Sequence, residues 1–437
     1  MKKVLLCLIL IPGLFALQGC KKDKDSSSSS YTNRIILADL QIGSGQITLS
    51  WSRLDNPDFE GYLIVRRDFP GTNYIDYPYV IKSITDPSTT TYTDTDVPYT
   101  SYLEYQVVGY ITTGDPYSPQ IIYSNIKTYE RPEIKTYSFT LNDVIPDLQN
   151  NIFYVFESDS GKITRLNFET HTIEKSVNTN AQIGFCDYGV VNNAKQIYVP
   201  RKDGWIFIYD AETLNKIDQI NFGESVESVV FNDNKLFANG SVNGWYDEGI
   251  RVFDCVTKAE ISENYLYSSG VRLKLVPGTH TRMMGLESSS YSDIYSLVYD
   301  GSGNLVASHS GYLEYEVDQH ILRMFPDGSR LITSYEGTII DTSLQYIVTL
   351  PYGNYQFSDF DFKPDLSTIY VCCSNYKKIL LFSNPGYSLI QEINTLGYPT
   401  RIFYKDNQLI CLSSTTASSY YPYSYARNYF IEKVSLP

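Results

Sequence analysis

The sequence predicts an all-β protein with two domains, a β-sandwich followed by a seven-bladed β-propeller. The composition favours strands, because the 437 residues include 40 tyrosines and aromatic side chains are enriched in sheets. Short runs in which apolar and polar residues alternate recur along the chain, as in half-buried strands. Beyond about residue 133 a strand-rich unit repeats roughly every 43 residues, a spacing typical of four-stranded propeller blades. A chain of this length also exceeds what one hydrophobic core usually supports.

The chain begins with the features of a secretory signal. Met1–Lys3 is basic, Val4–Leu17 is apolar, and Leu17–Cys20 closes the run. About 20 apolar residues are needed to span a bilayer, so the run is too short for a membrane anchor. The segment resembles a bacterial lipoprotein signal with its lipobox, although Gln18 stands where a small residue is usual. The resemblance implies cleavage after residue 19 and lipid on Cys20; a generic secretory signal followed by an incidental cysteine is the alternative.

Residues 20–30 are expected to form a lipidated, flexible tether. Lys21–Asp25 alternates in charge and Ser26–Ser30 is a serine run, too polar to bury a core. The charged stretch resembles the outward-sorting signal that follows the lipidated cysteine in surface lipoproteins of the Bacteroidota. The resemblance implies an outer-membrane lipoprotein that is exposed at the cell surface and held to the membrane by acyl chains on Cys20.

Charge and cysteine content exclude several classes of partner. The formal net charge is −14 and the isoelectric point is about 4.8, which argues against nucleic acid, because phosphates require a basic surface. No C-x-x-C spacing occurs, so we expect neither a disulfide framework nor a metal site, and no cofactor. The cysteines after the tether are predicted to be buried thiols: Cys186, Cys255, Cys372, Cys373 and Cys411.

Residues 31–130 are predicted to form the sandwich. Gln46–Trp51 alternates apolar and polar residues, and Gly61–Arg67 and Tyr102–Tyr110 read as further strands. Seven short strands in about 100 residues favour two packed sheets.

Three aromatic positions in this domain carry a family resemblance. Trp51, Tyr62 and the segment Tyr105–Val107 match the core tryptophan, the central-strand tyrosine and the tyrosine-corner strand of a fibronectin type III domain. The resemblance implies that the aromatic rings fill the core and that the corner hydroxyl satisfies a backbone group. It also implies that the domain serves as a spacer or docking module.

Residues 131–437 are predicted to form the propeller. Each unit contains a strand of the type Ile-Tyr-Val and then an Ile-x-Val-x-Asp strand, in which the aspartate caps the next turn, as at Asp210 and Asp254. The second strands of the seven units are Ile152–Val155, Ile197–Val199, Leu236–Ala238, Met283–Gly285, Leu331–Thr333, Ile369–Val371 and Leu409–Cys411.

This repeat resembles the YVTN-type propellers over about residues 133–437. The likeness is clearest in blades two and three and fades in blades four and five. Six or eight blades are the alternatives, because Ser288–His320 is irregular. The chain stops at Tyr429–Pro437, which by count is the third strand of the last blade. Glu133–Leu141 is therefore predicted to supply the fourth strand, so that no sheet edge is left open.

A ligand site is expected on the face that receives the connections between second and third strands and between successive blades. Aromatic side chains beside polar ones suit glycan binding, since a ring packs on the apolar face of a sugar, and they suit peptide binding as well. Frequent tyrosines that only pack at blade junctions are the alternative for each position. The predicted ligand-binding residues are Arg201, Asp203, Trp205, Trp245, Tyr246, Tyr291, Tyr335, Tyr376, Tyr398, Tyr421 and Tyr423.

Signals for catalysis are few. The four histidines lie in separate segments, and no Gly-x-Ser-x-Gly or phosphate-binding glycine motif occurs. One run alternates acidic residues and ends in a histidine, and side chains two apart on a strand share a face at about 7 Å, close enough for acid–base work. A solvated strand or connection is the alternative. The weak catalytic candidates are Glu314, Glu316, Asp318 and His320.

Three classes of function are compatible with these features. A non-catalytic surface lipoprotein that binds a glycan or a protein is favoured, with the first domain as a spacer. A propeller-fold hydrolase or lyase acting on an extracellular polysaccharide is the second, and an envelope assembly scaffold is the third. The sequence predicts no oligomeric state.

Overall fold

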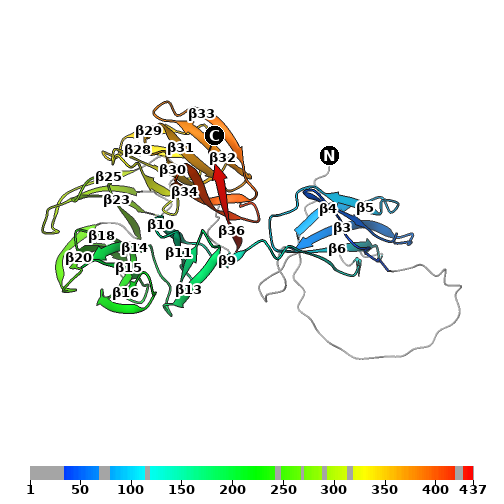
Figure 1. The fold of residues 1–437 in the computed structure, drawn as a ribbon, viewed down its shortest axis with the longest axis horizontal. Helices are drawn as coiled ribbons and strands as arrows, with labels where there is room; N and C mark the ends of the chain where they lie inside the picture. The colour runs from blue at the N-terminus through cyan, green and yellow to red at the C-terminus, as the bar shows by residue number, and fades with distance from the viewer. Residues whose placement is uncertain are drawn as a thin grey trace.

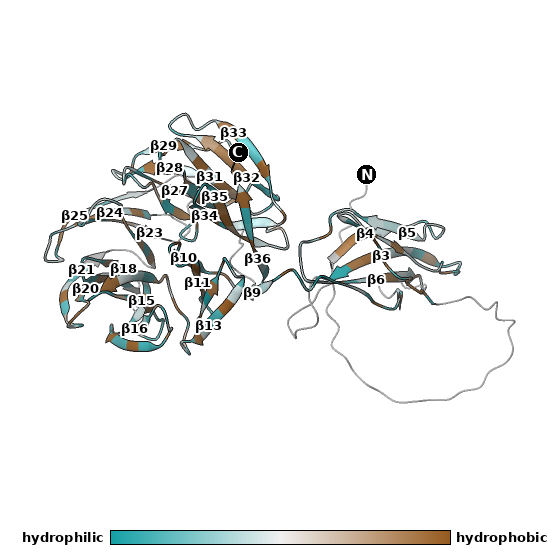
Figure 2. Cartoon of the chain, viewed as in Figure 1, coloured by the Kyte–Doolittle hydropathy of each residue, from teal (hydrophilic) through white to brown (hydrophobic). Residues whose placement is uncertain are grey.

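The computed structural model describes residues 34–67, 79–113, 119–241, 248–266, 270–287, 293–312, 318–418 and 427–436. Within these ranges the regular structure is β-strand, which confirms the predicted all-β class. The strands fall into a first and a second region, joined near β9 (Tyr137–Phe139) and β36 (Arg427–Ser435) (Figure 1). Figure 2 shows apolar residues spread over the strands of both regions. None of the described ranges holds a helix long and apolar enough to cross a membrane.

The first region consists of two antiparallel sheets. One has the strand order β1–β2–β5, and the other has the order β4–β3–β6–β7, with β8 also paired to β6. Both sheets contribute to a single apolar cluster. The strands are β1 (Gln41–Gly43), β2 (Gln46–Ser50), β3 (Phe59–Arg67), β4 (Tyr79–Ile84), β5 (Thr91–Asp94), β6 (Tyr102–Ile111), β7 (Gln120–Tyr123) and β8 (Lys127–Glu130).

The three aromatic residues that carried the family resemblance lie in this cluster. The rings of Trp51 and Tyr62 meet edge to face with centroids 5.6 Å apart, and the Tyr62 hydroxyl accepts the N–H of Leu54 at 2.7 Å. The expectation that the Tyr105 hydroxyl bonds to a backbone group is wrong. Its hydroxyl donates to the Asp94 carboxylate at 2.8 Å, because that carboxylate is buried and a buried acceptor needs donors.

The second region consists of seven four-stranded antiparallel sheets, as a seven-bladed propeller requires. Its predicted second strands are confirmed as β11, β15, β19, β23, β27, β31 and β35. The first four sheets are β10 (Asp143–Asp147), β11 (Ile152–Glu157), β12 (Lys162–Asn167) and β13 (Thr172–Asn178); β14 (Asp187–Val191), β15 (Ala194–Pro200), β16 (Trp205–Asp210) and β17 (Lys216–Asn221); β18 (Ser225–Asn232), β19 (Lys235–Ser241), β20 (Glu248–Asp254) and β21 (Glu260–Leu266); β22 (Val271–Leu275), β23 (Arg282–Glu287), β24 (Asp293–Tyr299) and β25 (Leu305–Tyr312).

The remaining sheets complete the repeat, and the last borrows a strand from the start of the region. They are β26 (Leu322–Met324), β27 (Arg330–Thr333), β28 (Thr338–Asp341) and β29 (Tyr346–Thr349); β30 (Phe357–Phe362), β31 (Thr368–Cys373), β32 (Lys378–Ser383) and β33 (Leu389–Asn394); and β34 (Tyr398–Lys405), β35 (Gln408–Ser414), β36 and β9.

Neighbouring sheets share apolar clusters all the way round. The first and second sheets share one cluster, and the pairs that follow share one each. The seventh and first sheets meet in the same way, where the rings of Phe403 and Phe153 lie 4.9 Å apart. Burial of these apolar side chains stabilises the ring and sets the sheets face to face.

The predicted closure of the ring is confirmed. β9 pairs antiparallel with β36, so that Tyr137 faces Tyr429 and Phe139 faces Arg427. Tyr137 and Phe139 are buried in the cluster between the seventh and first sheets. The predicted segment was longer than the three residues that pair, because the residues before Tyr137 form the link to the first region.

Turn chemistry follows the sequence closely at one end of the ring. Asp210 accepts the N–H of Thr213 at 2.7 Å, and Asp254 accepts the N–H of Thr257 at 2.6 Å, as the predicted caps require. In three of the seven sheets the first and second strands are joined by two-residue turns with positive φ, namely Asn192–Asn193, Asp233–Asn234 and Asp406–Asn407. Asparagine and aspartate tolerate that backbone, which allows these three turns to be tight.

Candidate functional site

The candidate residues lie at the opposite end of the ring from these tight turns. Second and third strands are joined there by segments of four to twelve residues, of which residues 415–426 form the longest. Arg201 and Asp203 lie between β15 and β16, Tyr335 between β27 and β28, and Tyr376 between β31 and β32, while Trp205 and Tyr398 begin β16 and β34. Seven predicted residues lie outside the described part of the chain: Trp245, Tyr246, Tyr291, Tyr421, Tyr423, Glu314 and Glu316.

Arg201 and Asp203 form an ion pair within the turn that precedes Trp205. The buried Arg201 guanidinium donates to both carboxylate oxygens of Asp203, with Nε–Oδ1 at 2.9 Å. It also lies over the ring of Phe207, 3.8 Å from the centroid. Gly204 at φ 92° allows the turn, because a Cβ there would meet the backbone of the next connection at 3.0 Å. The ion pair and the ring contact therefore restrain the turn that leads into the half-buried Trp205.

The described tyrosines of this face differ in exposure. Tyr376 is 40% exposed and meets Tyr355 edge to face at 5.1 Å. Tyr335 packs against the cluster between the fifth and sixth sheets. The ring of Tyr398 lies 5.4 Å from the Lys377 ammonium, and burial raises the pKa of the Tyr398 hydroxyl. Tyr376 is thus the tyrosine of this set most open to a ligand.

Charged side chains of the inner strands meet at the centre of the ring. Arg272 of β22 pairs with Asp143 of β10, which joins the fourth sheet to the first. Arg323 of β26 makes two 2.8 Å hydrogen bonds to Asp359 of β30. Arg401 of β34 donates to backbone carbonyls of both neighbouring sheets. The sheets are therefore tied together across the centre by charge-assisted hydrogen bonds.

Neighbouring cations at the centre of the ring keep the Asp143 carboxylate ionised. Burial alone would raise the pKa of Asp143, but Arg272, Lys274 and Arg401 lower it to about 2. Burial and the neighbouring Arg272 lower the pKa of the Lys274 ammonium to about 8. The Asp143 carboxylate is consequently ionised throughout the physiological range.

Two of the four weak catalytic candidates lie beside this centre. The Nδ1 atom of His320 is 3.0 Å from Oδ1 of Asp318. The His320 ring lies 5.2 Å from that of Phe185, which precedes β14 and bridges to Ser228 of β18. Burial would raise the pKa of Asp318, but the hydrogen-bonded His320 holds it below its ordinary value. A histidine oriented by a carboxylate has the arrangement of a general base.

The sequence did not single out Arg272, Asp143, Arg401 or Phe185, although each lies at the centre of the ring. Charged residues recur on the inner strands at Asp187, Lys274 and Asp361 too. A search for charged residues at equivalent positions of the repeats would have found the charged members of this set. No group of three or more His, Cys, Asp or Glu side chains that could hold a metal ion occurs within the residues that the structure describes.

The buried carboxyl of Asp361 on the inner strand β30 should make the stability of the protein depend on pH. It accepts the N–H of Tyr404 at 2.6 Å, and burial raises its pKa to about 6, against the opposing effect of Arg323. An unfolded aspartate titrates near 4, so the folded protein binds more protons between about pH 4 and 6. The stability that this residue contributes is therefore present at low pH and lost as the pH rises through 6.

Replacing Asp361 by Asn should remove this pH dependence. The wild-type free energy of unfolding, measured relative to D361N by urea titration, should fall by up to about 3 kcal/mol between pH 4 and 7. A difference that stays constant over this range would contradict a raised pKa at Asp361.

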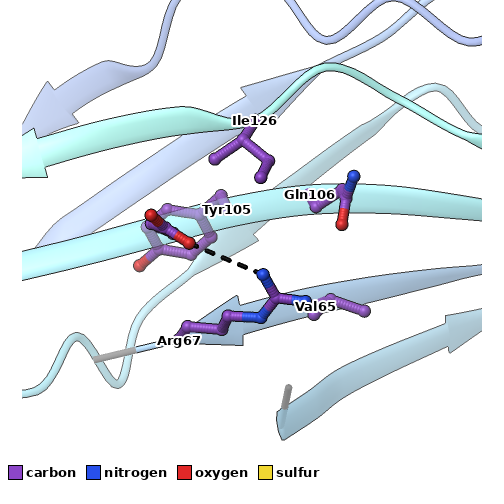
Figure 3. Close-up of a pocket in the computed structure, with 6 residues that line it drawn as sticks. Val65, Arg67, Tyr105, Gln106 and Ile126 are labelled. Carbon is purple, nitrogen blue, oxygen red and sulfur yellow. Dashed lines mark ion pairs between the residues drawn. The ribbon is translucent and has the colours of Figure 1, made fainter. Parts of the chain in front are cut away.

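A small pocket lies between strands of the first region (Figure 3). It leaves about 0 Å³ for a water-sized molecule, whereas small-molecule sites enclose roughly 300 to 1,000 Å³. An ion pair between Arg67 and Glu104 at 3.6 Å crosses it. The pocket therefore does not compete with the propeller face as a ligand site. Its lining residues are Val65, Arg67, Glu104, Tyr105, Gln106 and Ile126.

Comparison with known proteins finds similar folds but no similar sequences. No protein-family model matches the chain, and no curated protein matches its sequence. Solved structures that match include the dihydro-heme d1 dehydrogenase NirN, at 14% identity and a TM-score of 0.47 over 65% of each chain. The computationally designed protein Ika8 matches at 12% identity and a TM-score of 0.46, over 68% of this chain and 98% of Ika8.

The hydrazine synthase of Kuenenia stuttgartiensis matches at 11% identity with a TM-score of 0.51, over 68% of this chain and 96% of that one. The hydrazine synthase is a propeller-type protein, and the seven four-stranded sheets of the second region have the same arrangement. The second region is a β-propeller. At these identities the likeness concerns the fold alone, and the matched part spans about two thirds of NirN.

Proposed function

We propose that this protein is a lipid-anchored, non-catalytic binding protein of the bacterial cell surface, whose propeller face binds a glycan or a protein. A fibronectin type III-like sandwich of residues 31–130 links the propeller of residues 131–437 to the anchor. The strand order β1–β2–β5 against β4–β3–β6–β7 and the aromatic core around Trp51 support the sandwich assignment. The lipobox before Cys20 supports the anchor.

One observation carries the binding role. Trp205 is half-buried at the start of β16, directly after the turn that pairs Arg201 with Asp203. An aromatic ring held in place loses little conformational freedom when a ligand packs on it, and neighbouring polar groups can orient that ligand. Tyr376 offers a second exposed ring on the same face.

An array of glycans and peptides tests the proposal. The soluble chain from residue 31 onward should bind members of one class, and that class identifies the ligand. An absence of binding on both arrays, with a protein that unfolds cooperatively, would contradict the binding role.

The anchor has its own test. Metabolic labelling with a fatty acid should mark the wild-type protein and place it in the outer-membrane fraction, because the thiol of Cys20 accepts the lipid. Cys20→Ser should lose both the label and the membrane association. Label that persists in this variant would contradict lipidation at Cys20.

A hydrolase or lyase acting on an extracellular polysaccharide is the second candidate, and the hydrogen bond between His320 and Asp318 favours it. If the pair is catalytic, H320A should abolish turnover of a polysaccharide and leave its binding intact. An absence of turnover by the wild-type protein on every polysaccharide that it binds would reject this candidate.

A further inference from the structure

Two connections, one from each region, meet in an ion pair. Asp96 lies between β5 and β6 of the first region, and Lys377 lies between β31 and β32 of the propeller. The Lys377 ammonium is 2.5 Å from Oδ1 of Asp96. The two side chains are 26% and 66% exposed, and an exposed pair of this kind contributes little by itself. The pair can fix the two regions only if both connections are rigid and an apolar contact accompanies it.

The connection that carries Asp96 is held by a buried carboxylate. Asp94 accepts hydrogen bonds from Arg66 and from the Tyr105 hydroxyl, each at 2.8 Å. Its other oxygen accepts the N–H of Asp96 at 3.0 Å. Arg66 also donates to the backbone carbonyl of Asp96 at 2.7 Å. The core of the first region therefore fixes the backbone that presents Asp96.

The propeller side is fixed as well. The backbone carbonyl of Lys377 accepts the N–H of Thr395 at 3.0 Å, which ties its turn to the next connection. The ammonium lies over the Tyr398 ring. Lys377 is thus directed between an aromatic face and the Asp96 carboxylate.

An aromatic contact accompanies the ion pair. Tyr99, three residues beyond Asp96, packs on Phe430 of β36 with ring centroids 4.6 Å apart. Phe430 is only 1% exposed, so the Tyr99 ring contacts a side chain that belongs to the interior of the last sheet. Aromatic pairs of this kind contribute about 0.5 to 1.5 kcal/mol beyond the area that they bury.

The segment that links the two regions, between β8 and β9, makes side-chain contacts at both of its ends. The Arg131 guanidinium lies 5.9 Å from the Tyr99 ring centroid and donates to the carbonyl of Pro98. The hydroxyls of Ser101 and Thr136 are 3.1 Å apart and share a hydrogen bond. The link thus leaves the first region under restraint and enters β9 directly.

We infer that the first region docks on the propeller at the sixth and seventh sheets, so that the two form one rigid unit rather than two domains on a flexible link. Tyr398, predicted as a ligand-binding residue, then packs against Lys377 in this docking contact instead of binding a ligand. The functional consequence, a ligand face held at a fixed angle to the sandwich that links it to the anchor, rests on the proposed function. The docking itself holds whether or not the propeller binds a ligand.

Carbodiimide coupling of the full chain tests the docking, because it joins a lysine to a carboxylate only when the two are in contact. Mass spectrometry should find an isopeptide bond between Asp96 and Lys377. The ion pair between Lys127 and Asp39, also at 2.5 Å, lies within the first region and provides the internal control. Mixing isotope-labelled and unlabelled protein should give no mixed Asp96–Lys377 product.

Three variants sharpen this result. K377R keeps the charge but cannot be coupled, and should lose the product. The charge swap D96K/K377D should restore a coupled peptide pair. The single variant Y99A should reduce the yield of the Asp96–Lys377 product severalfold. Coupling of Lys127 to Asp39 without any product between Asp96 and Lys377, or a mixed-isotope product, would overturn the inference. So would an undiminished yield in Y99A.

Discussion

Replacing Asp143 by Ala should lower the free energy of unfolding by about 3 to 5 kcal/mol, the cost of leaving one member of a buried ion pair uncompensated. The Arg272 guanidinium is only 3% exposed at the centre of the ring and would lose its carboxylate partner there. Urea titration at pH 7 measures the change. The double variant D143L/R272M should recover much of the loss, since apolar side chains of similar size can replace a buried pair.

An exposed ion pair provides the control. Arg251 and Glu263 lie 2.9 Å apart with side chains 23% and 35% exposed, so E263A should cost only about 0 to 1 kcal/mol. If D143A costs no more than E263A, the Arg272–Asp143 pair does not hold the centre together.

Removing β9 should have an effect of similar size. A chain that begins at Asn142 lacks Tyr137 and Phe139, both buried between the seventh and first sheets. Burying an aromatic side chain contributes roughly 2 to 3 kcal/mol, so the loss should amount to about 5 kcal/mol. The unpaired edge of β36 would also favour aggregation. Thermal unfolding and size-exclusion chromatography measure the two effects.

A chain that begins at Arg131 keeps β9 and serves as the comparison. It should unfold cooperatively a few degrees below the full chain, because it loses the Tyr99 contact with Phe430 but keeps the apolar clusters between the propeller sheets, which contain no side chain from the first region. Equal melting of the chains from Arg131 and Asn142 would contradict the closure of the ring by β9.

The repeat was predictable because each second strand is buried on both faces and therefore reads as a continuous apolar run, such as Ile152–Val155. Runs of this kind at regular spacing gave the number of sheets. Closure by Tyr137–Phe139 followed from counting strands to the end of the chain. Local signals that recur along the chain were sufficient for the fold.

The charged centre was not predictable in the same way. Asp143 and Arg272 are far apart in sequence and meet only when the ring closes. Each lies on an inner strand, where a charge among apolar residues resembles the polar face of a half-buried strand. The partner of Tyr105 was missed for a related reason, since Asp94 became a buried acceptor only through tertiary packing.

The candidate face was predictable in position but not in the state of its side chains. Topology places Arg201, Trp205 and Tyr376 at the same end of the ring. Whether each contacts solvent depends on neighbours that no pattern reveals. Arg201 is buried in an ion pair, whereas Tyr376 is 40% exposed.

The central claim is that ligand binding occurs on the face that carries Trp205. Its most direct test is the affinity of the soluble chain for an array-identified ligand, measured for W205A and for Y346A. Tyr346 is 42% exposed on the outer strand β29 and is the matched control. We expect W205A to bind roughly thirtyfold more weakly, equivalent to about 2 kcal/mol, and Y346A to bind as the wild type does. Unchanged affinity in W205A, or an equal loss in Y346A, would contradict the claim.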